Sequence, residues 1–301
     1  MDYKTMLHEV IKKKFIEVAE REGEAPQIDA NYHLKDPSDN LVVPMAEKVL
    51  EMYRNGNGNE LNSKMSSIRS SAAMTFNLLG NGPVEIKSGS HAGKYNLIEY
   101  EYRLETLKNN PKKEPHPAHL DAYLEGENED IYCEMKMFEW LLSSDHKLRP
   151  AYLEAENYLV PRKDADCFSR LFRNLVHKKG QSGELFSEGR YDCLQMAKHL
   201  LAIYNKVAKP DYKPKRVTLL NCVWEFTHPE VLEGYEGKYS KMLDEEHEGF
   251  EKFKELATEL VVPLFEAKGV PLSIEYITAS ELMESIAYEE PIRRKLERYI
   301  V

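Results

Sequence analysis

Three short segments between residues 96 and 138 constrain the fold most, because each has a strand-like pattern and the connections between them are short. Residues 96–104 alternate apolar and polar side chains, which is the period of a strand with one buried face. Residues 119–125 and 131–138 follow, and turn-forming residues 126–130 join them. Strands connected this closely pair antiparallel, so we predict a three-strand meander.

A fourth strand is predicted at residues 215–226, the most continuously apolar strand-like segment of the chain. Such a run is typical of a central strand covered on both faces. A short strand is predicted at 272–278, and residues 139–210 are expected to be mainly helical. The predicted helices span residues 4–21, 44–52, 60–79, 190–207, 238–267 and 279–299. The pattern therefore predicts an α/β fold whose mixed sheet, a meander plus a central strand, is flanked by helices.

We expect three regions along the chain, on the basis of where helical and extended patterns change. Residues 1–57 form an N-terminal helical extension, and residues 58–230 form the α/β core. A helical insertion at about residues 139–188 interrupts that core. Residues 231–301 form a C-terminal helix-strand-helix unit packed on the core.

Composition limits the class of protein. With 301 residues, 42% of them apolar, the chain can bury a sizeable core. No apolar run is long enough to cross a bilayer, and the N-terminus mixes acidic and basic residues, so we expect a cytoplasmic protein with no membrane partner. The four cysteines lie far apart without a CxxC pair, which predicts free, mostly buried thiols.

The net charge of −10 disfavours a polyanionic partner at long range. The charge is uneven, however: residues 1–144 carry −7, residues 145–216 carry +6 and residues 225–301 carry −9. The basic middle segment could hold a phosphate backbone locally, and it could equally be an ordinary solvated surface.

Two carboxylates and a lysine stand out within the meander. Residues two apart on a strand share a face, so Glu134 and Lys136 should point one way while Cys133 and Met135 pack on the other. Asp121 should lie on the adjacent strand, close to Glu134. Phosphodiester hydrolysis uses this set of groups, because carboxylates hold a divalent cation and a lysine positions water or stabilises charge.

The acid-x-Lys spacing alone is weak support, because this chain has other triplets such as Glu85-Ile86-Lys87 and Glu236-Gly237-Lys238. Only Glu134-Met135-Lys136 lies in an apolar strand after a hairpin that carries a further acid. Burying three charged groups without a function would be costly. The alternative is an exposed sheet edge with a cross-strand salt bridge.

Short motifs across residues 58–200 share one arrangement: a Gly-rich turn, a serine run, acids on successive strands and polar positions on a later helix. They are Gly58-Asn59-Glu60-Leu61, Ser70-Ser71-Ala72-Ala73 with Asn77, Tyr100-Glu101, His119-Leu120-Asp121, Cys133-Glu134-Met135-Lys136, and Gln195 with Lys198. This arrangement resembles the PD-(D/E)XK nuclease superfamily, and within it a bacterial branch. Leu120 replaces the proline of the superfamily name, and Met135 replaces a small residue.

The resemblance implies a restriction-endonuclease-like core and a metal site. In that interpretation Asp121 and Glu134 hold one or two Mg²⁺ or Mn²⁺ ions, and Glu101 and Glu60 supply a further ligand. Lys136 orients or deprotonates the attacking water. Gln195 acts on the site from the neighbouring helix. Two alternatives stay open, a helix-dipole role for Glu60 and a solvated helix position for Gln195.

The expected substrate is a nucleic acid, DNA in the first instance, contacted by the basic side chains Lys198, Arg173, Lys178 and Lys179. Groups of basic side chains of this kind are more often ordinary solvent-exposed surface. We therefore weigh two hypotheses, a metal-dependent nuclease and a non-catalytic protein that uses the same fold to bind nucleic acid or a protein partner. The sequence leaves a homodimer open.

Overall fold

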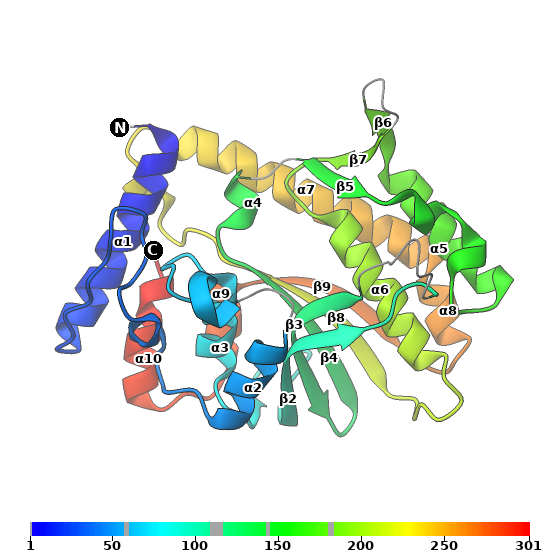
Figure 1. Cartoon of the computed structure of the whole chain (residues 1–301), viewed down its shortest axis with the longest axis horizontal. Helices are drawn as coiled ribbons and strands as arrows, with labels where there is room; N and C mark the ends of the chain where they lie inside the picture. Colours follow the sequence, from blue (N-terminus) through cyan, green and yellow to red (C-terminus); the bar gives the residue numbers. More distant parts are fainter. Residues whose placement is uncertain (1, 57–59, 109–116, 143–144, 180–183) are drawn as a thin grey trace.

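The computed structural model describes residues 2–56, 60–108, 117–142, 145–179 and 184–301, and a six-stranded sheet organises them (Figure 1). The strand order is β1-β2-β3-β4-β8-β9. Strands β1 to β4 pair antiparallel, whereas β4, β8 and β9 are parallel. The predicted fold class, a mixed sheet made of a meander plus a central strand, is confirmed. The strands are β1 (Val84–Ile86), β2 (Gly93–Leu104), β3 (Ala118–Gly126), β4 (Glu129–Lys136), β8 (Arg216–Val223) and β9 (Leu272–Thr278).

Helices cover both faces of this sheet. On β4, Cys133 and Met135 join one hydrophobic cluster while Tyr132 joins the other, because successive side chains alternate between faces. The first cluster includes side chains of α1 (Tyr3–Arg21), α2 (Glu47–Asn55), α3 (Ser71–Leu79), α9 (Ala279–Ser285) and α10 (Glu290–Leu296). The second includes side chains of α5 (Arg162–Leu175), α6 (Cys193–Val207) and α8 (Val262–Glu266). The long helix α7 (Glu236–Leu260) contributes to both.

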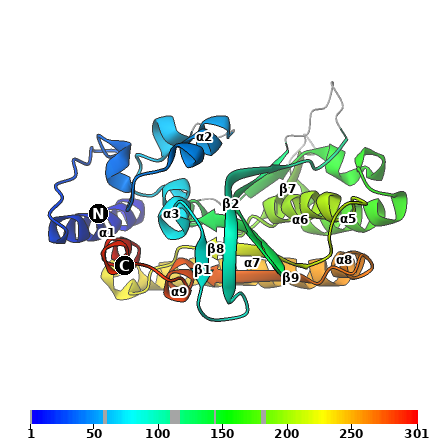
Figure 2. The ribbon, with the colours of Figure 1, turned by 90° about the horizontal axis from the view of Figure 1, so that it is seen from below.

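The two helical groups lie at opposite ends of the molecule. Figure 2 shows α1, α2 and α3 at one end and α5, α6 and α8 at the other, with the sheet between them. Strand β4 therefore passes between two separately packed cores, which explains why all but the last of its residues are buried.

The segment predicted to be mainly helical contains a second sheet, so that prediction is wrong in part. Its strands are β5 (Asp145–Leu148), β6 (His177–Lys179) and β7 (Glu184–Glu188), in the order β5-β7-β6. Strands of three to five residues are too short to establish an alternating pattern. Helices α4 (Glu139–Leu142) and α5 and the short helices η3 (Pro150–Leu153) and η4 (Ala155–Asn157) complete the segment up to α6.

Three predicted helices are broken, one of which, expected at 238–267, is divided at Val261 into α7 and α8. The helix expected at 60–79 consists of a π-turn, η2 (Glu60–Lys64), and then α3, whose first turn is capped by Ser70. The helix expected at 279–299 is divided into α9, α10 and η6 (Glu297–Tyr299), and Pro291 lies in the first turn of α10. A proline supplies no backbone N–H and so begins a new helix. The 126–130 turn is also shorter than predicted, because β4 begins at Glu129.

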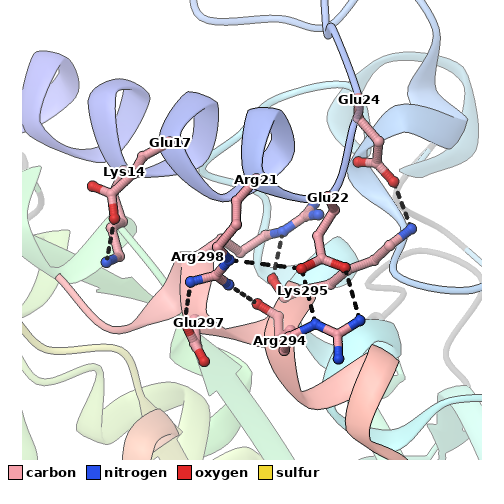
Figure 3. Close-up of polar contacts among 9 residues, drawn as sticks. All are labelled: Lys14, Glu17, Arg21, Glu22, Glu24, Arg294, Lys295, Glu297 and Arg298. Atoms are coloured by element: carbon pink, nitrogen blue, oxygen red, sulfur yellow. Dashed lines mark hydrogen bonds and ion pairs between the residues drawn. The ribbon is translucent and has the colours of Figure 1, made fainter.

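Ion pairs join the end of α1 to the C-terminal helices (Figure 3). Arg21 pairs with Glu297 at 2.6 Å, and Glu22 pairs with Arg294 at 3.0 Å. The Arg298 guanidinium also lies 4.5 Å from the ring centre of Phe15, which belongs to α1. The first and last helices of the described chain are therefore packed and paired together.

The cysteine prediction is confirmed: all four thiols are free, and three are buried. Among the described residues, no helix combines the length and apolarity needed to cross a membrane. The division at residues 57 and 230 stays a prediction.

Candidate active site

The candidate site lies where strands β3 and β4 cease to pair. Their register ends with Ala122 opposite Cys133, and Asp121 comes immediately before it. The Asp121 Oδ2 atom accepts a hydrogen bond of 2.7 Å from the Met135 backbone N–H. The side chain thereby takes the place of a ladder partner, and it stands beside Glu134.

Glu134 is the centre of a buried network. Its Oε1 atom lies 2.6 Å from Lys136 Nζ, and its Oε2 atom lies 2.9 Å from His199 Nε2. Lys136 Nζ also donates to Gln195 Oε1 at 2.8 Å. The predicted residues Glu134, Lys136 and Gln195 are thus brought together, with Glu134 and Lys136 on the strand face toward α6.

Helix α6 positions two side chains of this network. Asp192 caps the helix by accepting from the Gln195 backbone N–H. Gln195 and His199 are four residues apart and so share one helix face. His199, which is 2% exposed, was not among the predicted site residues. Its spacing from Gln195 is the signal that could have identified it.

The carboxylates have different proton affinities. Burial opposes the charge of Glu134, but Lys136 and His199 outweigh it and lower the pKa of Glu134. Burial and then the charge of Glu134 raise the pKa of Asp121 well above its ordinary value. Burial would lower the pKa of Lys136, yet Glu134 and Asp121 together raise it, so Lys136 keeps its proton.

A second pair of acids lies close to the first. Burial, followed by the charges of Glu60 and Glu134, raises the pKa of Glu101 to about 7. Glu101 has a φ of 52°, a left-handed conformation that is rare for a non-glycine residue. A Cβ atom on Gly56 would lie 2.7 Å from Glu101 Cγ, so only glycine fits beside this side chain. Glu60 is 8% exposed and pairs with Lys64 at 2.7 Å.

The donor set suits a hard divalent cation in its chemistry, because the side chains offer carboxylate oxygens and an excess of negative charge. The raised pKa values of Asp121 and Glu101 indicate that the cationic side chains nearby do not offset the cost of burying these carboxylates. Within the described ranges, however, no three His, Cys, Asp or Glu side chains already converge as a metal-binding group.

The family of the chain follows from a comparison with family models. The model described as "Restriction Endonuclease associating with ARP" matches residues 2–291. The chain belongs to this family. No curated protein and no solved structure matches it. Membership of a restriction-endonuclease-associated family supports a nuclease-like role.

In this member of the restriction-endonuclease-associated family, the predicted substrate-binding residues belong to α6, α5 and β6. The Lys198 ammonium lies 5.9 Å from the ring centre of Tyr152. Arg173, on α5, donates to the Leu153 carbonyl at 2.6 Å. Lys178 and Lys179 belong to β6 of the small sheet. None of the hydrogen bonds described above brings them to the carboxylates.

The serine run that carried part of the resemblance has structural contacts in this family member. Ser70 Oγ caps α3, and Ser71 Oγ donates to Glu139 at 2.8 Å. Asn77 Nδ2 donates to the carbonyl of Asn40 at 2.8 Å. Gly58 and Asn59, from the Gly-rich turn, lie outside the described residues.

Proposed function

We propose that this protein is a divalent-metal-dependent nuclease of the PD-(D/E)XK type that hydrolyses phosphodiester bonds, in the first instance in DNA. The observation that supports this most is the grouping of Asp121, Glu134 and Lys136 at the point where β3 and β4 separate. A purely structural ion pair would not require a second acid with a raised pKa beside it.

In this proposal Asp121 and Glu134 hold Mg²⁺ or Mn²⁺, and Glu101 and Glu60 extend the negative site. When bound, the cation would neutralise phosphate charge and lower the pKa of a water molecule. The protein side chains do the rest: Gln195 and Glu134 fix the Lys136 ammonium, and His199 holds the other oxygen of Glu134.

The role of Lys136 follows from its protonation. A lysine whose pKa is raised carries its full charge at neutral pH. We therefore assign it to stabilising negative charge on the phosphate in the transition state, and not to deprotonating water. Of the roles expected from the sequence, orientation of water and electrostatic stabilisation are retained, and deprotonation of water is dropped.

The test is cleavage of plasmid and linear DNA with Mg²⁺ or Mn²⁺, with EDTA added as a control. Asp121→Asn and Lys136→Ala should each lower the rate by on the order of 10³-fold, and circular dichroism at the assay temperature should show that both variants remain folded. Lys87→Ala is the matched control, because Lys87 ends an acid-x-Lys triplet on the exposed side of β1. Undiminished cleavage by both site variants would contradict the proposal.

A second candidate is a non-catalytic module that binds nucleic acid or protein. Its specific support is that both Glu134 oxygens already have protein partners, Lys136 and His199. Calorimetry separates the two functions. Saturable Mn²⁺ binding that Asp121→Asn abolishes supports the nuclease, and absence of binding by the unmodified protein supports the module.

DNA contact is proposed for the basic residues Lys198, Arg173, Lys178 and Lys179. Their support is the net charge of +6 over residues 145–216, which sets this segment apart from the acidic remainder. Removing one phosphate contact should reduce the salt dependence of DNA affinity by about one unit of slope. Lys178→Ala is the first variant to test, because Lys178 is exposed.

A further inference from the structure

A cavity of about 140 Å³ lies beside Lys136, between β4, α6 and α7. Its lining includes Gln195, Asn221, Tyr191 and Glu246. Within the part of the chain that the structure describes, three buried polar atoms of the lining have no protein hydrogen-bond partner: Tyr191 Oη, Glu246 Oε2 and His146 Nε2. A polar cavity of this size holds several water molecules, and such atoms are normally satisfied by water.

The groups of the proposed metal site are not free to accept a proton from the attacking water. Asp121, Glu134 and Glu101 are assigned to the cation, which would keep them ionised, and Lys136 is already protonated. Hydrolysis nevertheless releases one proton from the water that attacks phosphorus. Another acceptor is needed, and it must reach the site through hydrogen-bonding groups or water.

Glu246 meets this requirement by position. It lies on α7, is 1% exposed, and shares the cavity lining with Lys136. Burial and the nearby charge of Glu225 raise the pKa of Glu246 to about 7, against the opposing effect of His146 and Lys136. The other ionisable groups of the cavity are Glu139, Arg190 and Asp192. A carboxyl with this pKa can both accept and release a proton near neutral pH.

A route to solvent continues from Glu246. The Oε1 atom of its neighbour Glu225 lies 2.8 Å from His247 Nε2 and 2.6 Å from Tyr276 Oη. The His247 side chain is 46% exposed. His247 and Tyr276 line a surface groove between α7 and β9. Ionisable groups therefore extend from the cavity beside Lys136 to a different face of the molecule.

We propose that Glu246 accepts the proton of the attacking water through the water of this cavity, and that Glu225 and His247 return it to solvent. The inference rests on the nuclease function proposed above. In the step, the water oxygen bonds to phosphorus as the bond from phosphorus to the leaving sugar oxygen breaks. One proton of the attacking water passes to the Glu246 carboxylate, and the leaving oxygen takes a proton from solvent water.

The test compares pH profiles of DNA cleavage between pH 5.5 and 9. For the unmodified protein, the rate should rise through about pH 7, where Glu246 ionises. Glu246→Gln keeps the side-chain shape but cannot accept a proton, so the rate above pH 8 should fall on the order of 10²-fold and the step near pH 7 should disappear. Glu246→Asp should restore the step, because it restores a carboxyl. Glu248→Gln, on the exposed face of α7, should leave the profile unchanged.

Two results would overturn the proposal. One is a Glu246→Gln protein that cleaves with the unmodified pH profile. The other is a flat profile for the unmodified protein, which needs no variant and so applies even if Glu246→Gln does not fold. An unmodified protein that never cleaves contradicts the nuclease function itself and removes this inference with it. Cleavage together with an unchanged Glu246→Gln profile contradicts only the proton route.

Discussion

The two ends of strand β4 bury carboxylates in opposite ways. At the N-terminal end, Glu129 is surrounded by donors: its Oε2 accepts from Arg216 and Tyr95, and its Oε1 accepts from Thr218 and lies 3.0 Å from His91. These partners outweigh burial and lower the pKa of Glu129 to about 2. These donors therefore offset the cost of burying the Glu129 carboxylate.

At the C-terminal end the compensation is incomplete. Lys136 pairs with Glu134. Burial and neighbouring acids oppose the charge of Asp121 and Glu101 and raise the pKa values of both. Folding alone would not favour such an arrangement, since each uncompensated acid lowers stability. The comparison teaches that buried acids with sufficient partners stabilise the sheet, whereas buried acids without them cost stability, and these are the acids of the metal site proposed above.

The largest effect expected from this comparison is on stability. Glu129→Gln should lower the free energy of unfolding by about 3 kcal/mol, because it removes the anion that pairs with Arg216 and one of the two anions that contact His91. Urea denaturation measures the change. Glu127→Gln, in the exposed turn just before, is the control and should have little effect. If Glu129→Gln were as stable as the control, the N-terminal network would not be structural.

The next effect concerns the C-terminal acids. Mn²⁺ at one hundred times its dissociation constant should stabilise the protein by about 2.7 kcal/mol, because the cation binds only the folded state. Thermal unfolding with and without Mn²⁺ measures this. Asp121→Asn should abolish the gain, and Glu129→Asp should keep it. A gain that survives Asp121→Asn would place the cation elsewhere.

A smaller effect depends on pH. His91 contacts Glu129 and Glu275, and despite burial these acids raise the pKa of His91 to about 9 from an ordinary value of 6.5. A raised histidine pKa contributes stability that is fully present below pH 6.5 and is lost as pH rises to 9. The loss between pH 6.5 and 9 should be roughly 2.5 kcal/mol. Urea denaturation across this range should show it in the unmodified protein, and His91→Gln should flatten the dependence.

The control for the pH experiment is His228→Gln. The His228 side chain is 59% exposed, so its removal should leave the slope between pH 6.5 and 9 unchanged. Equal slopes in the His91→Gln and unmodified proteins would show that the N-terminal network does not hold a charged histidine.

Much of the sheet could be predicted because the order of apolar and polar residues along each strand shows which of its faces are buried. The alternation of Cys133 and Met135 with Glu134 and Lys136 indicated which side chains face α6, and the structure agrees. Asp121 was placed near Glu134 by hairpin geometry. Short strands such as β6 could not be predicted, since three residues establish no period.

Residues that act through distant contacts were harder to predict. His199 lies among apolar residues of α6, where a histidine usually packs in the core. Its spacing of four from Gln195 was the available signal, and only the fold shows that it meets Glu134. Glu246 belongs to a helix rich in glutamate, and nothing local distinguishes it from its exposed neighbours. Glu129 falls in the predicted turn 126–130, and its role could not be predicted because its partners Arg216 and His91 come from distant segments.

The packing of α1 against the C-terminal helices has a consequence for synthesis. Phe15 of α1 is covered by Arg298, and Arg21 pairs with Glu297, which lies 276 residues further along the chain. Until the ribosome has added residues 294–298, α1 lacks these partners and must remain incompletely packed. Completion of this core therefore waits for the synthesis of a segment that is distant in the sequence.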